Sequence, residues 1–187
     1  LPGVMGPVNA ASDFAAQWTA GAGITARQYK GLGVYQLRKV VPPPTPGGQM
    51  EVATSEYEDL LTEWMTEFNR ICGEHFADAR KMVQNGIRDG YLWLWKDPDP
   101  VSVATARFGT RNGARIGGVY TPREHRGKGY ASANVAELSQ RLLDSGCGFC
   151  YLFTDLANPT SNSIYRRIGY EQVSEFAIMS FAPEGKS

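Results

Sequence analysis

The chain reads Arg126-Gly127-Lys128-Gly129-Tyr130-Ala131 directly between a short apolar segment, Ile116 to Val119, and a helical pattern. Apolar side chains recur at helical spacing in that pattern: Ala131, Val135, Leu138 and Leu142. The two glycines therefore stand at the start of a predicted helix, where the first backbone N–H groups lack intrahelical partners and attract an anion. Glycine lets the backbone approach a diphosphate closely and adopt positive φ, while Arg126 and Lys128 add positive charge. The hexapeptide predicts a phosphate site, although by itself it fits an ordinary strand-to-helix turn equally well.

A second segment favours the phosphate site over an ordinary turn. Residues 158–170 read NPTSNSIYRRIGY, and the loop order R-x-x-G-x-A differs from the G-x-G-x-x-G of dinucleotide folds and lacks a Walker Lys-Ser/Thr pair. Together the two segments resemble the GNAT superfamily of acetyl-CoA-dependent N-acetyltransferases. In that family an R/Q-x-x-G-x-G/A loop binds the coenzyme A pyrophosphate, and a later N-x6-Y segment followed by G-F or G-Y completes the site. The resemblance covers roughly residues 34–182.

The resemblance implies a set of site residues for acetyl-CoA. The backbone of Val119 and Thr121, with Tyr120 between them, is expected to hold the pantetheine amides. The pyrophosphate loop comprises Arg126, Gly127, Lys128, Gly129, Tyr130 and Ala131. Asn158 is expected to complete this site, although it is equally well placed to cap the next helix. No metal site is expected, since His75 and His125 lack partners at ligand spacing.

The family reaction is direct attack of a neutral amine on the acetyl thioester. It needs an oriented thioester, a polarised carbonyl, for which the family uses a backbone N–H near Val119, and a proton for the leaving thiolate. Tyr165 matches the position of the acid. A phenol of pKa ~10 protonates a thiolate of conjugate-acid pKa ~8.5 at a cost of only about 2 kcal/mol. The alternative for Tyr165 is a tyrosine packed by its ring, with its hydroxyl bonded elsewhere.

The general base is not assigned by the sequence. Relatives often use a glutamate or a bridging water, but residues 116–121 contain no carboxylate. Glu63, Glu67 and His75 lie on the first helices, which shape the acceptor pocket in the family, and each also fits an exposed helix position. The expected acceptor is a primary amine of a small molecule or peptide, and a homodimer is left open.

The patterns along the chain predict a mixed α/β (α+β) fold. A mostly antiparallel central sheet carries helices on both faces, and one parallel strand pair is splayed as in the GNAT fold. The Gly117-Gly118 pair predicts a bulge or a close backbone approach in its strand. Helices are expected at 8–20, from a Ser55–Glu58 capping box to Ile71, at 77–88, 129–144 and 159–168, and strands at 34–41, 91–95, 101–108, 114–121, 151–154 and 170–181.

Two segments are expected in the domain organisation. Residues 1–33 are interpreted as an N-terminal extension or the remnant of a preceding domain, and residues 34–187 as the acetyltransferase domain. The chain starts at Leu1, which suggests that the natural N-terminus is missing.

Composition excludes several classes of function. Lys plus Arg and Asp plus Glu number 19 each, so no global field favours nucleic acid or an acidic membrane. No apolar run spans a bilayer, and the first basic residue is Arg27, which argues against a signal peptide. A soluble, cytoplasmic protein is expected, and its three cysteines weakly favour a reducing compartment.

The alternatives to an enzyme of this family are a thiol redox protein and a non-catalytic binding module. Cys147-Gly148-Phe149-Cys150 resembles a redox C-x-x-C, but it follows a predicted helix rather than opening one, so Cys150 is interpreted as a core residue and Cys147 as part of a turn. The other alternative, an acyl-CoA-binding or sensory module without turnover, stays open.

Overall fold

A computed structural model describes residues 3–73 and 78–184 of the protein. Within them, eight strands form one mixed sheet in the order β1-β8-β2-β7-β6-β5-β4-β3. The strands are β1 (Gly3–Pro7), β2 (Ile24–Leu37), β3 (Gln49–Val52), β4 (Leu92–Lys96), β5 (Pro100–Phe108), β6 (Gly113–Tyr120), β7 (Phe149–Asp155) and β8 (Glu171–Pro183). Strands β6 and β7 pair in parallel, whereas the pairs β1–β8, β2–β8, β3–β4, β4–β5 and β5–β6 are antiparallel. The expected fold class is confirmed.

The chain divides into two compact units. One unit, called the terminal unit here, combines residues 1–36, 152–166 and 170–187, and the other, the central unit, comprises residues 37–151 and 167–169.

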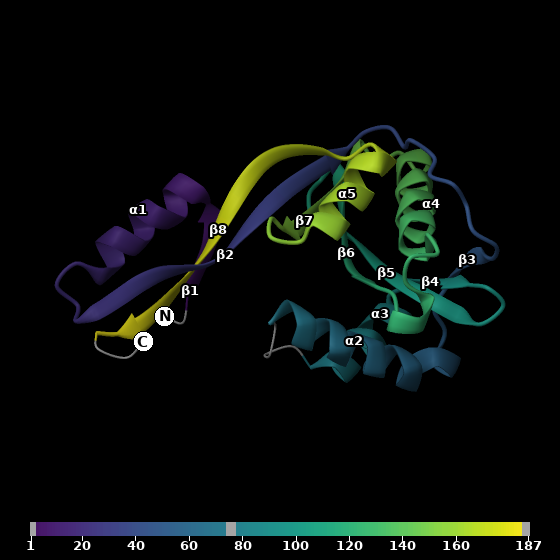
Figure 1. Cartoon of the computed structure of the whole chain (residues 1–187), viewed down its shortest axis with the longest axis horizontal. Coiled ribbons are helices and arrows are strands. Elements are labelled where there is room, and N and C mark those ends of the chain that lie inside the picture. Colours follow the sequence, from purple (N-terminus) through teal and green to yellow (C-terminus); the bar gives the residue numbers. More distant parts are fainter. Residues whose placement is uncertain (1–2, 74–77, 185–187) are drawn as a thin grey trace. The chain divides into compact units, whose positions relative to one another are not determined.

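The central unit contains the antiparallel strands β3 to β6 and three α-helices. These are α2 (Glu58–Cys72), which follows the short 3-10 turn η1 (Ser55–Tyr57), α3 (Ala79–Arg88) and α4 (Tyr130–Asp144). Figure 1 shows α2 and α3 on one face of β4 to β6, and α4 on the other. The expectation of helices on both faces is therefore confirmed in this unit.

The sequence pattern of α2 places Leu60, Leu61, Trp64, Phe68 and Ile71 at helical spacing, and this apolar face covers the sheet. Leu61, Trp64 and Met65 are buried in a cluster with Val83 of α3 and with the sheet. Burying a side chain of this size contributes about 1.5–3 kcal/mol. The helix ends at Gly73, which has a φ of 72°. Ile71, expected on the same apolar face, is instead 54% exposed in the last turn.

A β-bulge interrupts the antiparallel pair β5–β6. Val103 pairs with Tyr120 and Thr105 pairs with Gly117, so Gly118 and Val119 together oppose a single residue of β5. Gly118 has a φ of 54°. The bulge expected at Gly117-Gly118 is confirmed. On its other edge, β6 pairs with β7 only from Gly113 to Arg115, although β6 continues to Tyr120.

The terminal unit is organised by the long antiparallel pairing of β2 with β8, which runs from Ile24↔Pro183 to Gln36↔Glu171. Strand β1 pairs with the other edge of β8. Helix α1 (Val8–Thr19) buries Ala11 and Ala15, and its Phe14 ring lies 6.5 Å from the ring of Phe181 on β8. Figure 1 shows α1 lying along β8. Helix α5 (Pro159–Ile168) also belongs mainly to this unit.

Several local predictions were wrong. Strand β2 begins at Ile24 rather than 34, and β1 and β3 were not predicted. Residues 24–33 lack a clean apolar alternation, so the sequence pattern did not predict a strand there. The strand pairs with β8, a partner distant in sequence. The capping box is absent as well. Ser55 lies in the 3-10 turn, and Tyr57 occupies the cap position of α2 without a side-chain bond.

Candidate active site

The predicted phosphate loop has the backbone geometry that its glycines implied. Gly127 and Gly129 have φ angles of 78° and 90°, and Gly129 is the N-cap residue of α4. The N–H of Ala133 donates to the Gly129 carbonyl at 3.0 Å, which closes the first helical turn. The preceding amides of that turn, at Tyr130, Ala131 and Ser132, therefore have no acceptor within the helix. A Cβ on Gly127 would meet no atom within 4 Å, so the loop leaves open space beside it.

The two basic side chains of the loop differ in their surroundings. Lys128 is exposed. The Arg126 Nε donates to the Thr121 carbonyl at 2.9 Å, and its guanidinium lies 5.8 Å from the centre of the Tyr120 ring. Arg126 therefore fixes the loop against the end of β6 while its charge remains at the surface.

Tyr130 turns its side chain away from the loop surface. The residue is 8% exposed, and its hydroxyl donates to Asp97 Oδ2 at 2.7 Å. This hydrogen bond, together with burial, raises the pKa of the Tyr130 phenol above its ordinary value. Tyr130 can thus serve an anion only through its backbone N–H, and its side chain belongs to the support of α4.

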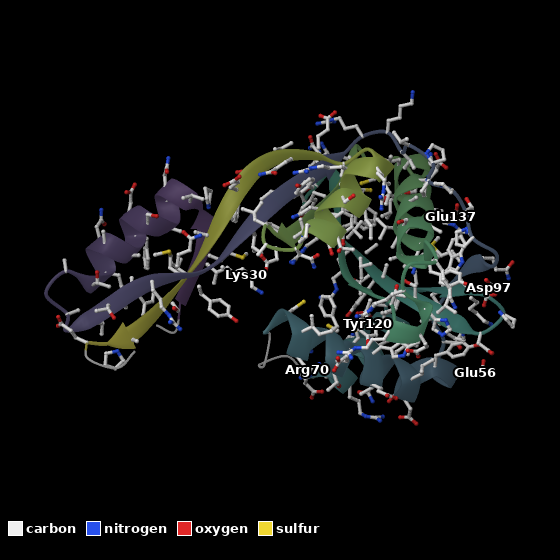
Figure 2. The ribbon with its side chains drawn as sticks, in the orientation of Figure 1. Lys30, Glu56, Arg70, Asp97, Tyr120 and Glu137 are labelled. Atoms are coloured by element: carbon white, nitrogen blue, oxygen red, sulfur yellow. The ribbon has the colours of Figure 1, made fainter. Side chains whose placement is uncertain are left out.

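The end of β6 places Val119, Tyr120 and Thr121 beside the loop. The Tyr120 side chain points toward α2 (Figure 2), where its ring lies 6.1 Å from that of Trp64. Burial raises the pKa of the Tyr120 phenol, while the positive charge of Arg126 acts in the opposite direction. The Ser102 hydroxyl donates to the Tyr120 carbonyl at 3.1 Å and accepts from the Thr121 hydroxyl at 3.0 Å. These bonds fix the strand end downstream of the bulge.

A groove of about 610 Å³ opens between α2 and the segment that follows β6. The buried rings of Trp64 and Tyr120 form its apolar part. Its charged residues are Asp59, Glu63, Glu67, Arg80, Arg123 and Glu124, the last two on the 3-10 turn η2 (Arg123–His125). Carboxylates therefore outnumber guanidinium groups along this wall.

The carboxylates of the groove are not equivalent. Arg70 contacts Glu67 at 2.7 Å and lowers the pKa of that carboxyl. Arg80 contacts Asp59 at 2.6 Å. Within residues 3–73 and 78–184, Glu63 and Glu124 take part in no ion pair. The sequence identified Glu63 and Glu67, but it missed Glu124, because nothing local to a Pro-Arg-Glu-His turn indicates that it faces α2. His75 lies outside the described residues.

Asn158 and Tyr165 belong to the terminal unit, whereas the loop and the groove belong to the central one. Asn158 caps α5, since its Oδ1 accepts from the Ser161 N–H at 3.1 Å. The predicted cap and the helix bounds are confirmed. Tyr165 is 9% exposed, and its ring meets that of Tyr170 edge-on at 5.9 Å. The assignment of either side chain to acetyl-CoA stays a prediction.

The cysteines occupy the positions expected of a turn and a core. Cys150 is fully buried, and desolvation raises the pKa of its thiol to about 12. The Cys147 thiol donates to the Phe149 carbonyl at 3.1 Å. A thiol with so high a pKa is a poor nucleophile at neutral pH, which argues against a redox pair.

Two further findings concern the residues that the structure describes. They contain no group of three or more His, Cys, Asp or Glu side chains arranged to hold a metal ion. In the same part of the chain, no helix has the length and apolar character needed to cross a membrane.

Comparison with known proteins identifies a family whose sequence pattern this chain matches. The sequence model of a family described as "Acetyltransferase (GNAT) family" matches residues 54–170. No curated protein matches the chain.

Solved structures show the same fold. A GCN5-related N-acetyltransferase from Kribbella flavida matches with a TM-score of 0.62 at 20% identity, covering 88% of this chain and 62% of that one. A GNAT-family acetyltransferase from Colwellia psychrerythraea matches with a TM-score of 0.66 at 17% identity, covering 97% and 65%. The PaiA N-acetyltransferase from Thermoplasma acidophilum, in complex with coenzyme A, matches with a TM-score of 0.54 at 12% identity, covering 72% of this chain and 98% of that one. The chain spans less than two thirds of the length of the first two structures.

Proposed function

Because the chain belongs to the GNAT acetyltransferase family, we propose that it transfers an acetyl group from acetyl-CoA to a primary amine of a small molecule or peptide. The observation that carries the proposal is the Arg126–Ala131 loop, with Gly127 and Gly129 at positive φ directly before α4. A similar fold binds coenzyme A in the PaiA N-acetyltransferase.

The donor fits the chemistry of the loop and of β6. The N-terminal amides of α4 suit the diphosphate, since helix N-termini present unpaired N–H groups and a favourable dipole. Lys128 adds an exposed cation. The bulge at Gly118 turns the backbone around Val119 away from regular pairing with β5, which leaves main-chain groups for the pantetheine amides.

The acceptor is assigned to the groove between α2 and η2. Carboxylates outnumber guanidinium groups there, and the Trp64 and Tyr120 rings add aromatic surface, so the groove favours a cation over an anion. An amine that arrives protonated must lose a proton before it attacks. Glu63 and Glu124 are the carboxylates proposed to take it, directly or through water. Glu67 is the weaker base, because its hydrogen bond and ion pair with Arg70 lower its pKa.

The reaction proposed is a single displacement. The neutral amine nitrogen forms a bond to the thioester carbonyl carbon, the C–S bond breaks, and the sulfur leaves with the bonding electron pair. Tyr165 donates a proton to that thiolate, the acylated nitrogen releases its extra proton to water to give the amide, and solvent reprotonates the phenolate. General-acid catalysis of this kind contributes about 10²–10⁴ in rate.

The test is an assay that detects free coenzyme A thiol while the protein is supplied with acetyl-CoA and a panel of polyamines, amino acids, aminoglycosides and peptides with free N-termini. Turnover with at least one amine, with the acetylated product identified by mass spectrometry, is expected. Calorimetry with coenzyme A runs in parallel. Tight binding of coenzyme A without turnover on any amine would favour the non-catalytic acyl-CoA-binding module. Absence of coenzyme A binding would contradict both the acetyltransferase and the binding module.

A further inference from the structure

Three segments of the central unit meet at the start of α4. The first contact joins the helix to the turn between β4 and β5, where the Tyr130 hydroxyl donates to Asp97 Oδ2 at 2.7 Å. The turn itself is closed by the Asp97 N–H, which donates to the Asp99 carbonyl at 2.8 Å. Figure 2 labels Asp97 at this turn. The backbone of the turn is thus closed by its own hydrogen bond, and the Asp97 carboxylate is bound by the first residue of the helix.

The third segment is the proline-rich loop of residues 42–48. The Trp95 Nε1 donates to the Gly47 carbonyl at 2.9 Å, which ties this loop to β4. A Cβ on Gly47 would lie 3.1 Å from both carboxylate oxygens of Asp97, so the loop backbone closes over that carboxylate. A Cβ on Gly129 would lie 3.8 Å from Pro46 Cδ. The loop therefore borders both Asp97 and the N-cap residue of α4.

This arrangement has a specific consequence for anion binding. Backbone N–H groups bind a phosphate only when several of them point at one position, because hydrogen bonds weaken steeply as they bend. Tyr130 is the first residue of α4, so its hydrogen bond to Asp97 fixes the turn that carries these N–H groups. The Asp97 carboxylate also brings negative charge to the region, which by itself would oppose an anion. Its contribution to binding must therefore come from geometry.

We infer that Asp97 is a positioning residue for the diphosphate of the donor, acting through the Tyr130 hydroxyl; the inference rests on the proposed function of the loop. The Asp97–Tyr130 pair affects the affinity for the diphosphate and does not affect the acetyl-transfer step.

The test compares a donor that contains the diphosphate with one that does not. S-acetylpantetheine carries the same thioester as acetyl-CoA but lacks the diphosphate and the adenosine 3′-phosphate attached to it. Asp97→Ala and Tyr130→Phe each remove the hydrogen bond, and we expect about a tenfold rise in the Kd for coenzyme A and in the KM for acetyl-CoA. The kcat at saturation and the kcat/KM for S-acetylpantetheine should stay at wild-type values. The double variant should lose no more than either single variant, because both remove one interaction.

Two further variants separate geometry from charge and from folding. Asp97→Asn keeps an oxygen that accepts from Tyr130 and removes the charge, so it should bind coenzyme A at least as tightly as the wild type. Asp99→Asn removes a charge from an exposed position of the same turn and should change nothing. Melting temperatures identify any variant that fails to fold, and Tyr130→Phe, which retains the buried ring, then carries the test alone.

The outcomes distinguish this inference from the proposed function. Unchanged coenzyme A affinity in folded Tyr130→Phe, or equal losses with both donors, would overturn the positioning role while the wild type still binds. A wild-type protein that binds no coenzyme A would instead overturn the proposed function, and the inference with it.

Discussion

Gly129 illustrates how one backbone angle can decide whether a helix start can face a ligand. Its φ of 90° turns the chain from η2 into α4, and a Cβ there would make only ordinary contacts with the loop at Pro44 and Pro46. The need for glycine at this residue is therefore conformational and functional, since space for a Cβ exists within the protein.

We expect Gly129→Val to weaken coenzyme A binding at least tenfold, because a β-branched residue disfavours positive φ and its side chain would occupy the ligand's approach to the amides. Calorimetry measures the affinity. The matched control is Gly146→Val after the other end of α4, where φ is 94° and a Cβ would meet no atom within 4 Å. It should cost a similar amount of stability and no affinity. Equal affinity in both variants would remove the loop from the site.

The Tyr165 side chain can contribute to catalysis through its hydroxyl or to packing through its ring. If it is the general acid, Tyr165→Phe should lower kcat by about 10²-fold and leave the affinity for acetyl-CoA unchanged, because the packed ring remains. Steady-state kinetics and calorimetry measure the two effects. Tyr170→Phe, which removes the hydroxyl from the neighbouring ring, should retain its kcat. A Tyr165→Phe enzyme with wild-type turnover would show that solvent or another group protonates the thiolate.

At the scale of elements, periodicity predicted helices and strands well where their partners are close in sequence. The α4 and α5 patterns gave bounds within a residue or two of those observed, and the β4–β6 meander was expected. The long β2 start and β1 were missed because their partner β8 follows more than a hundred residues later. In the site, the loop geometry was predictable from its glycines. The Tyr130–Asp97 bond and the position of Glu124 were not, since both depend on tertiary packing.

Two adjacent glycines offer a test of the β6 bulge, because Gly118 lies in it whereas Gly117 pairs regularly with Thr105. Gly118→Ala should destabilise the protein by about 1–2 kcal/mol, because an L residue at its φ of 54° is strained and the new Cβ would lie 3.1 Å from Thr105 Cγ2. Gly117→Ala should be neutral or slightly stabilising, since its Cβ would meet Thr105 only at 3.5 Å and the unfolded chain loses freedom. Urea unfolding of both variants measures the difference. Equal stabilities would mean that the bulge tolerates a side chain.

For the whole molecule, charge balance predicts a solution property. With a sequence pI near 6.9, the chain carries almost no net charge at neutral pH, so repulsion between molecules is weakest there. We expect the amount of polyethylene glycol needed to precipitate the protein to pass through a minimum near that pH and to rise on both sides. Turbidity titrations across the range measure it. A midpoint that changes in one direction only would show that association is governed by a local patch instead.

The pairing of β2 and β1 with β8 also determines an order of events during synthesis. Gly3 pairs with Ser180, so β1 has no strand partner until β8 has been made, and β2, which lies between β7 and β8 in the sheet, has none until β7 has been made. Residues 37–151 can meanwhile collapse on contacts among themselves. On a translating ribosome, the nascent N-terminal segment therefore waits as an unpaired strand edge, the state in which chaperones bind and aggregation begins.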